Sequence, residues 1–170
     1  MSSLHISAPA LDAIRRGWAE APAMTRRELL AAMTQGTLLV EREVKEGIPR
    51  GATGLTAASV TSDAFSTPVG ILGLVASSQA SATFVELGTR PHMPPVDALV
   101  PWVRAVLGMD AKRAPSVAYL VARKIARKGT EAKRPFAKAL ARTEGQILRM
   151  FEAAADRIAQ NLAGQGGGAA

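Results

Sequence analysis

The chain of 170 residues contains no cysteine, only two histidines, and aromatic side chains at 4% of positions. Without cysteine there is no disulfide framework, thiol nucleophile or thiolate zinc site. His5 and His92 lie far apart in the sequence, so no histidine-rich metal motif exists and few groups titrate near neutral pH. We therefore expect no metal centre, no cofactor and no enzymatic activity.

Long hydrophobic runs are also missing. No uninterrupted apolar stretch approaches the roughly 18 residues of a membrane span, and the N-terminus lacks the pattern of a secretory signal. Alanine is abundant instead, with 33 residues, and it favours helix while burying little surface. The sequence thus predicts an intracellular protein without a membrane partner, whose modest core is supplemented by subunit contacts.

Positive charge is concentrated in one part of the chain. The 21 basic residues exceed the 14 acidic ones by seven, and residues 101–150 alone hold 12 basic and 3 acidic residues. The densest cluster comprises Arg123, Lys124, Arg127, Lys128, Lys133, Arg134 and Lys138. Such a cluster is typical of a surface that binds phosphates, although a solvated face, or one paired with acidic residues of a neighbouring subunit, is more common. No base-reading motif accompanies it, so sequence-specific nucleic-acid recognition is not expected.

The first half of the chain begins with an expected arm or short helix over residues 1–24, interrupted by Pro22. Thr25 and Glu28 form a capping-box pattern, and apolar residues at helical spacing then predict a helix over residues 25–46. Residues 55–87 are rich in Val, Ile, Thr and Phe and almost free of charge. They predict three strands, at 55–62, 67–76 and 81–87, with the second in a central position because both of its faces are apolar.

The second half predicts helices. A stiff loop, Gly88-Thr89-Arg90-Pro91-His92-Met93-Pro94-Pro95, has three prolines that fix its backbone. Apolar periodicity and glycine stops then predict helices over 97–107, 114–128 and 134–163, followed by a disordered Gly/Ala tail over 164–170. The fold class is therefore α+β: a small antiparallel sheet of about three strands, with a possible edge strand, packed by a long N-terminal helix and two to three C-terminal helices. We expect one domain, spanning residues 25–163.

Candidates for chemistry are few. Glu86 has no second carboxylate nearby in the sequence, and Arg90 is a simple ion-pair partner for it, so a structural or interfacial role is expected. His92 lies between Pro91 and Met93 without an evident nucleophile or second ligand, which indicates a packed or hydrogen-bonded loop histidine. From the residues alone, the sequence predicts a basic α+β protein without a recognisable active site.

One segment carries a family resemblance. Phe84-Val85-Glu86-Leu87-Gly88-Thr89-Arg90-Pro91-His92-Met93-Pro94-Pro95 resembles the Y/F-x-E-x-G-T-x-P-H-x-P signature of a minor tail, or tail-completion, protein family of long-tailed bacteriophages. Upstream, Thr53-Gly54-Leu55 and Ser59 are similar to that family's turn into its first strand. Downstream, the helix ending in Lys128-Gly129-Thr130, then Pro135-Phe136 and Ala139-Leu140, is similar to the family's ending. The resemblance covers about residues 25–150.

The resemblance implies a virion structural protein of the neck, where the capsid connector meets the tail. Such a subunit assembles with copies of itself as a ring around the DNA channel, expected to be hexameric, and contacts head-closure or adaptor proteins and tail terminator or tail tube proteins. It is made in the host cytoplasm and ends in the virion. The implied interface loop comprises Glu86, Gly88, Thr89, Arg90, Pro91, His92 and Pro94. The basic cluster Arg123, Lys124, Arg127, Lys128, Lys133 and Arg134 would face the channel DNA or a partner. A tail terminator ring protein and a small non-specific DNA-binding protein remain alternatives.

Overall fold

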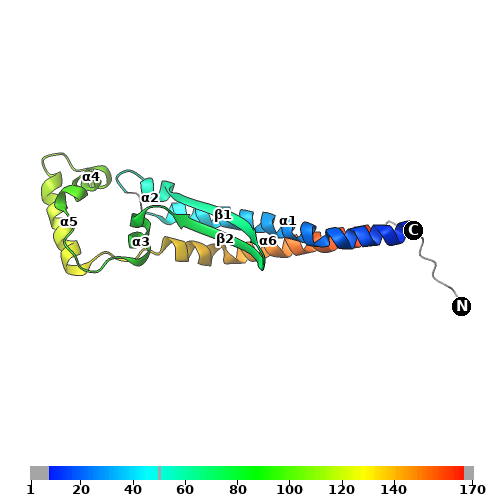
Figure 1. The fold of residues 1–170 in the computed structure, drawn as a ribbon. Helices are drawn as coiled ribbons and strands as arrows, with labels where there is room; N and C mark the ends of the chain where they lie inside the picture. Colours follow the sequence, from blue (N-terminus) through cyan, green and yellow to red (C-terminus); the bar gives the residue numbers. More distant parts are fainter. Residues whose placement is uncertain (1–7, 50, 167–170) are drawn as a thin grey trace. The chain divides into compact units, whose positions relative to one another are not determined.

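The computed structural model describes residues 8–49 and 51–166 (Figure 1). In chain order the elements are α1 (Ala8–Gly47), α2 (Leu55–Ala58), β1 (Val60–Thr67), β2 (Gly70–Ser77), α3 (Ala80–Leu87), α4 (Val96–Leu107), α5 (Ala114–Lys128) and α6 (Pro135–Gly166). The expected α+β class is confirmed: a long N-terminal helix and three long C-terminal helices accompany a small antiparallel sheet.

The N-terminal helix is longer than the sequence predicted. α1 runs through Pro22 without a break, so the expected interruption there is wrong, and Thr25 lies inside the helix instead of capping it. A proline within a helix is unfavourable by about 3 kcal/mol, and the alanine-rich sequence on both sides has the propensity to offset this. Glu28, the expected partner in the capping box, instead binds Arg157 of α6 with an Oε2–Nε distance of 2.9 Å. Residues 1–7 of the expected N-terminal arm lie outside the described residues.

The sheet of the described residues is a hairpin of two strands, β1 and β2. The predicted first strand is shifted, because residues 55–58 form the helical turn α2 and β1 begins only at Val60. The predicted central strand is β2, but in this hairpin it is an edge strand, with Leu72 and Leu74 about half exposed. Its other face packs closely: a Cβ added at Gly73 would lie 2.6 Å from the side chains of Met33 and Thr37 of α1.

The predicted third strand is wrong, since residues 80–87 form the helix α3. This segment is a short apolar run, which fits either a strand or a helix in a sequence pattern. The helix ends at Gly88, whose N–H donates to the carbonyl oxygen of Phe84 at 2.9 Å. The proline-bearing loop therefore follows a helix and not an extended segment.

The three C-terminal helices lie close to their predicted ranges, and that of α5 agrees to the residue. The short stretch 164–166 continues α6, whereas residues 167–170 of the expected tail lie outside the described residues. α4 and α5 pack on each other around Val103, Ala114 and Ala118, each fully buried. Ala122 extends this buried alanine stripe along α5, so the outward-facing side of the helix is left to its charged residues.

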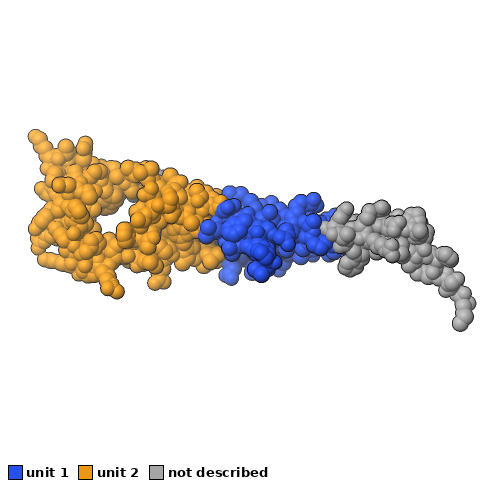
Figure 2. Space-filling view, viewed as in Figure 1, with its two compact units in different colours: residues 1–38, 63–74, 143–170 blue, residues 39–62, 75–142 orange. Residues whose placement is uncertain are grey.

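The chain forms two compact units (Figure 2). Unit 1 comprises residues 1–38, 63–74 and 143–170, and unit 2 comprises residues 39–62 and 75–142. In unit 1, α1 and α6 approach closely, and a Cβ on Gly36 would lie 3.4 Å from Ile147. Unit 2 contains α4, α5 and the segments that join them to α3 and α6.

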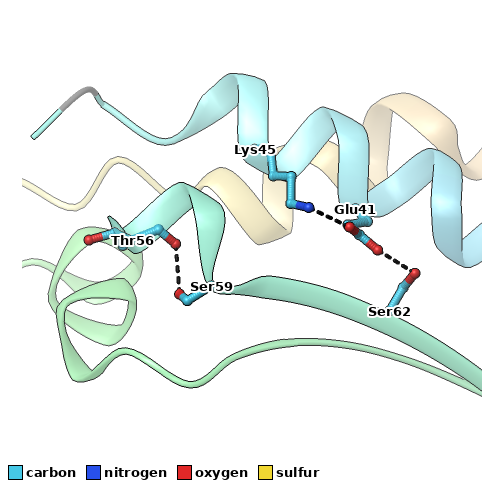
Figure 3. Close-up of polar contacts among 5 residues, drawn as sticks. All are labelled: Glu41, Lys45, Thr56, Ser59 and Ser62. Atoms are coloured by element: carbon cyan, nitrogen blue, oxygen red, sulfur yellow. Dashed lines mark hydrogen bonds and ion pairs between the residues drawn. The ribbon is translucent and has the colours of Figure 1, made fainter. Parts of the chain in front are cut away.

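A short polar network in unit 2 fixes β1 to α1 (Figure 3). One carboxylate oxygen of Glu41 accepts from Lys45 Nζ, and the other accepts from the Ser62 hydroxyl, both at 2.5 Å. The hydrogen bond from Lys45 and then that from Ser62 hold the pKa of Glu41 below its ordinary value. Ser59 similarly donates its hydroxyl to the carbonyl oxygen of Thr56 at 2.9 Å, tying the end of α2 to its own helical turn.

Candidate interaction site

Glu86, near the end of α3, caps the start of α6. Its carboxylate accepts the backbone N–H groups of Phe136 (2.9 Å) and Ala137 (3.2 Å). These N–H groups belong to the first turn of α6, where no partner exists within the helix and the positive end of the helix dipole favours an anion. Pro135, in the first helical position, has no N–H to satisfy. Glu86 therefore has a structural role, but its partner is the start of a helix 50 residues away and not the expected Arg90.

Two Gly-Thr dipeptides pair with each other beside this cap. Gly88-Thr89 follows α3 and Gly129-Thr130 follows α5, and the two threonines form an isolated antiparallel bridge. The Thr89 N–H donates to the Thr130 carbonyl oxygen at 3.1 Å, and the reverse bond measures 3.2 Å. The two hydroxyl oxygens lie 3.0 Å apart. We call these four residues the Gly-Thr clasp.

Two features require glycine at both positions of the clasp: the backbone conformation and the closeness of neighbouring atoms. Gly88 has φ 71° and ψ −176°, and Gly129 has φ 69° and ψ −160°, a region that only glycine occupies readily. A Cβ on Gly88 would lie 2.5 Å from the carbonyl oxygen of Thr130, and one on Gly129 would overlap the carbonyl oxygen of Thr89. The clasp thus joins the segment before α4 to the segment after α5, with the two backbones in direct contact.

The proline-bearing loop leaves the clasp towards α4. His92 is exposed, and its Nδ1 lies 2.9 Å from the carbonyl oxygen of Arg90, which confirms the expected hydrogen-bonded loop histidine. Apolar side chains around the loop are open to solvent: Phe84 is 57% exposed, Leu87 72% and Met93 51%. This concentration of exposed apolar surface beside a fixed backbone is typical of a protein–protein contact.

Four members of the basic cluster share one face of α5. We call this set, Arg123, Lys124, Arg127 and Lys128, the basic face. All four side chains are exposed, and together with Leu120 they line an open pocket of about 330 Å³. Arg123 lies over the ring of Tyr119, with its guanidinium carbon 6.0 Å from the ring centroid.

Lys133 and Arg134, the other two residues expected to face the channel DNA or a partner, lie between α5 and α6 and not on α5. Lys133 forms an ion pair with Glu131 at 2.8 Å, and its hydrogen bond holds the pKa of Glu131 below the ordinary value. The Lys133 N–H also donates to the Val85 carbonyl oxygen at 2.9 Å, next to the clasp. Arg134 immediately precedes α6 in a left-handed conformation, with φ 54°. These two residues are therefore part of the turn into α6.

Within the described part of the chain, no group of three or more His, Asp or Glu side chains is placed to hold a metal ion. None of the helices within residues 8–49 and 51–166 is long and apolar enough to span a membrane. Comparisons of the chain with family models, curated proteins and solved structures found no match.

The contact between the segment before α4 and the segment after α5 was not predicted from the sequence. Thr89 and Thr130 are 41 positions apart, so no local periodicity connects them. The available signal was the repeated Gly-Thr dipeptide, which follows a helix in both places. The capping of α6 by Glu86 was not predicted either. The signal for it was a helix that starts with proline and has no acidic residue in its first turn.

Proposed function

We propose that this chain is a non-enzymatic structural subunit of a bacteriophage neck, a tail-completion or minor tail protein that forms a ring with copies of itself and joins the tail to the capsid. The observation that carries the proposal is the meeting of the two segments on which the resemblance rests. The Glu-Gly-Thr segment after α3 and the Gly-Thr and Pro-Phe segments before α6 bind one another through Glu86 and the clasp. Residues far apart in the sequence thus act as one structural unit.

This unit supports assembly better than catalysis. The carboxylate of Glu86 already accepts two backbone N–H groups, so its oxygens serve the start of α6. The clasp anchors the start of the proline-bearing loop, the prolines restrict its backbone, and a rigid surface loses little entropy when it binds. Around it, Phe84, Leu87 and Met93 offer apolar contact area. Subunits that meet through two different surfaces of this kind form rings when the rotation between them closes.

The test is the oligomeric state of the purified chain and of two variants. We expect a closed ring by light scattering and electron microscopy, and we expect Leu87→Ser to dissociate it, because Leu87 is the most exposed apolar residue of α3. Leu148→Ser is the matched control, since that leucine is also exposed, at 57%, and lies within α6 and not next to the clasp. A wild-type chain that remains a monomer and binds no connector or tail protein would refute the proposal.

A further inference from the structure

The basic face of α5 gathers four cations on one helix surface without a carboxylate partner among the described residues. Elsewhere, ion pairs join Lys45 to Glu41, Arg113 to Asp110 and Arg157 to Glu28. In the described part of the chain, none of the four cations of the basic face lies within ion-pairing distance of a carboxylate. Four like charges held together on one helix repel each other, so a bound polyanion would relieve a repulsion already present.

We propose that the basic face binds the sugar–phosphate backbone of duplex DNA without reading its sequence. The inference goes beyond the proposed ring and does not depend on it. Residues 123, 124, 127 and 128 occupy successive turns on the side of α5 opposite Ala114, Ala118 and Ala122, so the buried alanine stripe directs all four cations outward.

The spacing of the charges fits a DNA duplex. At a rise of about 1.5 Å per residue, the four cations span roughly 7.5 Å of helix axis. Duplex DNA carries a phosphate charge for about every 1.7 Å of its axis, so about four phosphates occupy the same length. The two guanidinium groups suit phosphate oxygens because they can donate two parallel hydrogen bonds. No described acidic side chain on the exposed surface of α5 interrupts the array.

Other polyanions fit this surface less well. A basic helix that binds a lipid surface inserts a broad apolar face. On α5 the exposed large apolar residues are Tyr119 and Leu120, and the alanine stripe is buried against α4. A second copy of the chain has little excess negative charge to offer: outside residues 101–150, the sequence has 9 basic and 11 acidic residues (21 − 12 and 14 − 3), an acidic excess of only two.

The experiment measures binding of the full chain to a short fluorescent DNA duplex of arbitrary sequence. With four phosphates neutralised, affinity should fall about 100-fold between about 50 and 200 mM salt, a logarithmic slope of roughly −3.6. Replacing the basic face by glutamine, in R123Q/K124Q/R127Q/K128Q, should abolish most of this binding and flatten the slope. Glutamine keeps side-chain length and a similar helix propensity. The matched control R27Q/K112Q/K138Q/R149Q removes two arginines and two lysines from exposed positions elsewhere and should keep at least half of the slope.

Several results would overturn the inference. One is an equal loss of DNA binding in the two quadruple variants, which would mean that net charge alone matters. Others are tighter binding to poly-glutamate or to phosphatidylserine vesicles than to the duplex. Light scattering on the same samples separates this test from that of the ring: a variant that loses DNA but keeps its oligomeric state supports the inference, and a DNA-binding monomer supports it while refuting the proposed neck function. Circular dichroism spectra identical to that of the wild type are required for both variants.

Discussion

The basic face and the Gly-Thr clasp are neighbours in the sequence, since Gly129 follows Lys128 directly, but their polar groups have different partners. At the clasp, backbone N–H groups, carbonyl oxygens and two hydroxyls bind each other within the chain, and the Glu86 carboxylate beside it binds the start of α6. On the basic face, four cations find no carboxylate among the described residues. A region whose polar groups are satisfied internally serves the fold, whereas one whose charges are unpaired is available to a partner.

This difference reverses the impression that the sequence gives. The segment from Phe84 to Pro95 is the most motif-like part of the chain, with a glutamate, a glycine, a histidine and three prolines. In the structure Glu86 binds the start of α6, and Thr89 forms one half of the clasp. The basic face has no motif beyond its charge, yet its four cations have no carboxylate partner among the described residues. Motif density and availability for binding are therefore separate properties in this molecule.

The largest expected effect comes from breaking the clasp. Gly129→Ala should destabilise the protein by about 3 kcal/mol or more, because the new Cβ meets the Thr89 carbonyl oxygen in a backbone region where L-residues are already strained. Gly108→Ala is the matched control: Gly108 also has a positive φ, 66°, but nothing lies within 4 Å of the added Cβ. The control should lose only about 1 kcal/mol. Urea unfolding measures both values, and equal losses would show that close packing at the clasp contributes nothing.

An intermediate effect is expected at the cap of α6. Glu86→Ala should lower the free energy of unfolding by about 2 kcal/mol, since it leaves the N–H groups of Phe136 and Ala137 without their carboxylate. Glu86→Gln keeps one acceptor oxygen and should lose about half as much. Glu131→Ala removes only an exposed ion pair and should leave the free energy of unfolding nearly unchanged. If urea unfolding showed the same midpoint for Glu86→Ala and for the Glu131→Ala control, the capping role would be contradicted.

Elements defined by local signals were predicted well from the sequence. α5 has apolar periodicity, a proline at its start and Gly129 at its end, and its range was predicted to the residue. α3 was not, because residues 81–87 form a run too short to distinguish helical from strand periodicity. Its identity depends on distant partners such as the Lys133 N–H, which donates to the Val85 carbonyl oxygen.

The candidate site divides in the same way. The sequence was sufficient to group the cations of the basic face, since residues 123, 124, 127 and 128 share a helix surface by spacing alone. It was insufficient to separate Lys133 from them, because the ion pair with Glu131 and the turn into α6 are three-dimensional features. The contact of Glu86 with α6 joins residues 50 positions apart and has no local pattern at all.

The smallest expected effect tests whether repulsion among the charges of the basic face lowers the stability of the protein. Lys124 and Lys128 stand four positions apart, and like charges at this spacing destabilise a helix by about 0.2–0.5 kcal/mol. Lys124→Gln should therefore stabilise the protein by about 0.3 kcal/mol at low salt, raising Tm by about 1 °C. Lys128→Gln removes the same repulsion but also a favourable interaction with the C-terminal end of the helix dipole, so it should bring no gain. Calorimetry at low and high salt measures the difference, which should shrink as salt screens the charges. If Lys124→Gln instead destabilised the protein, Lys124 would have a favourable partner within the molecule, and the contrast between the clasp and the basic face would fail at that residue.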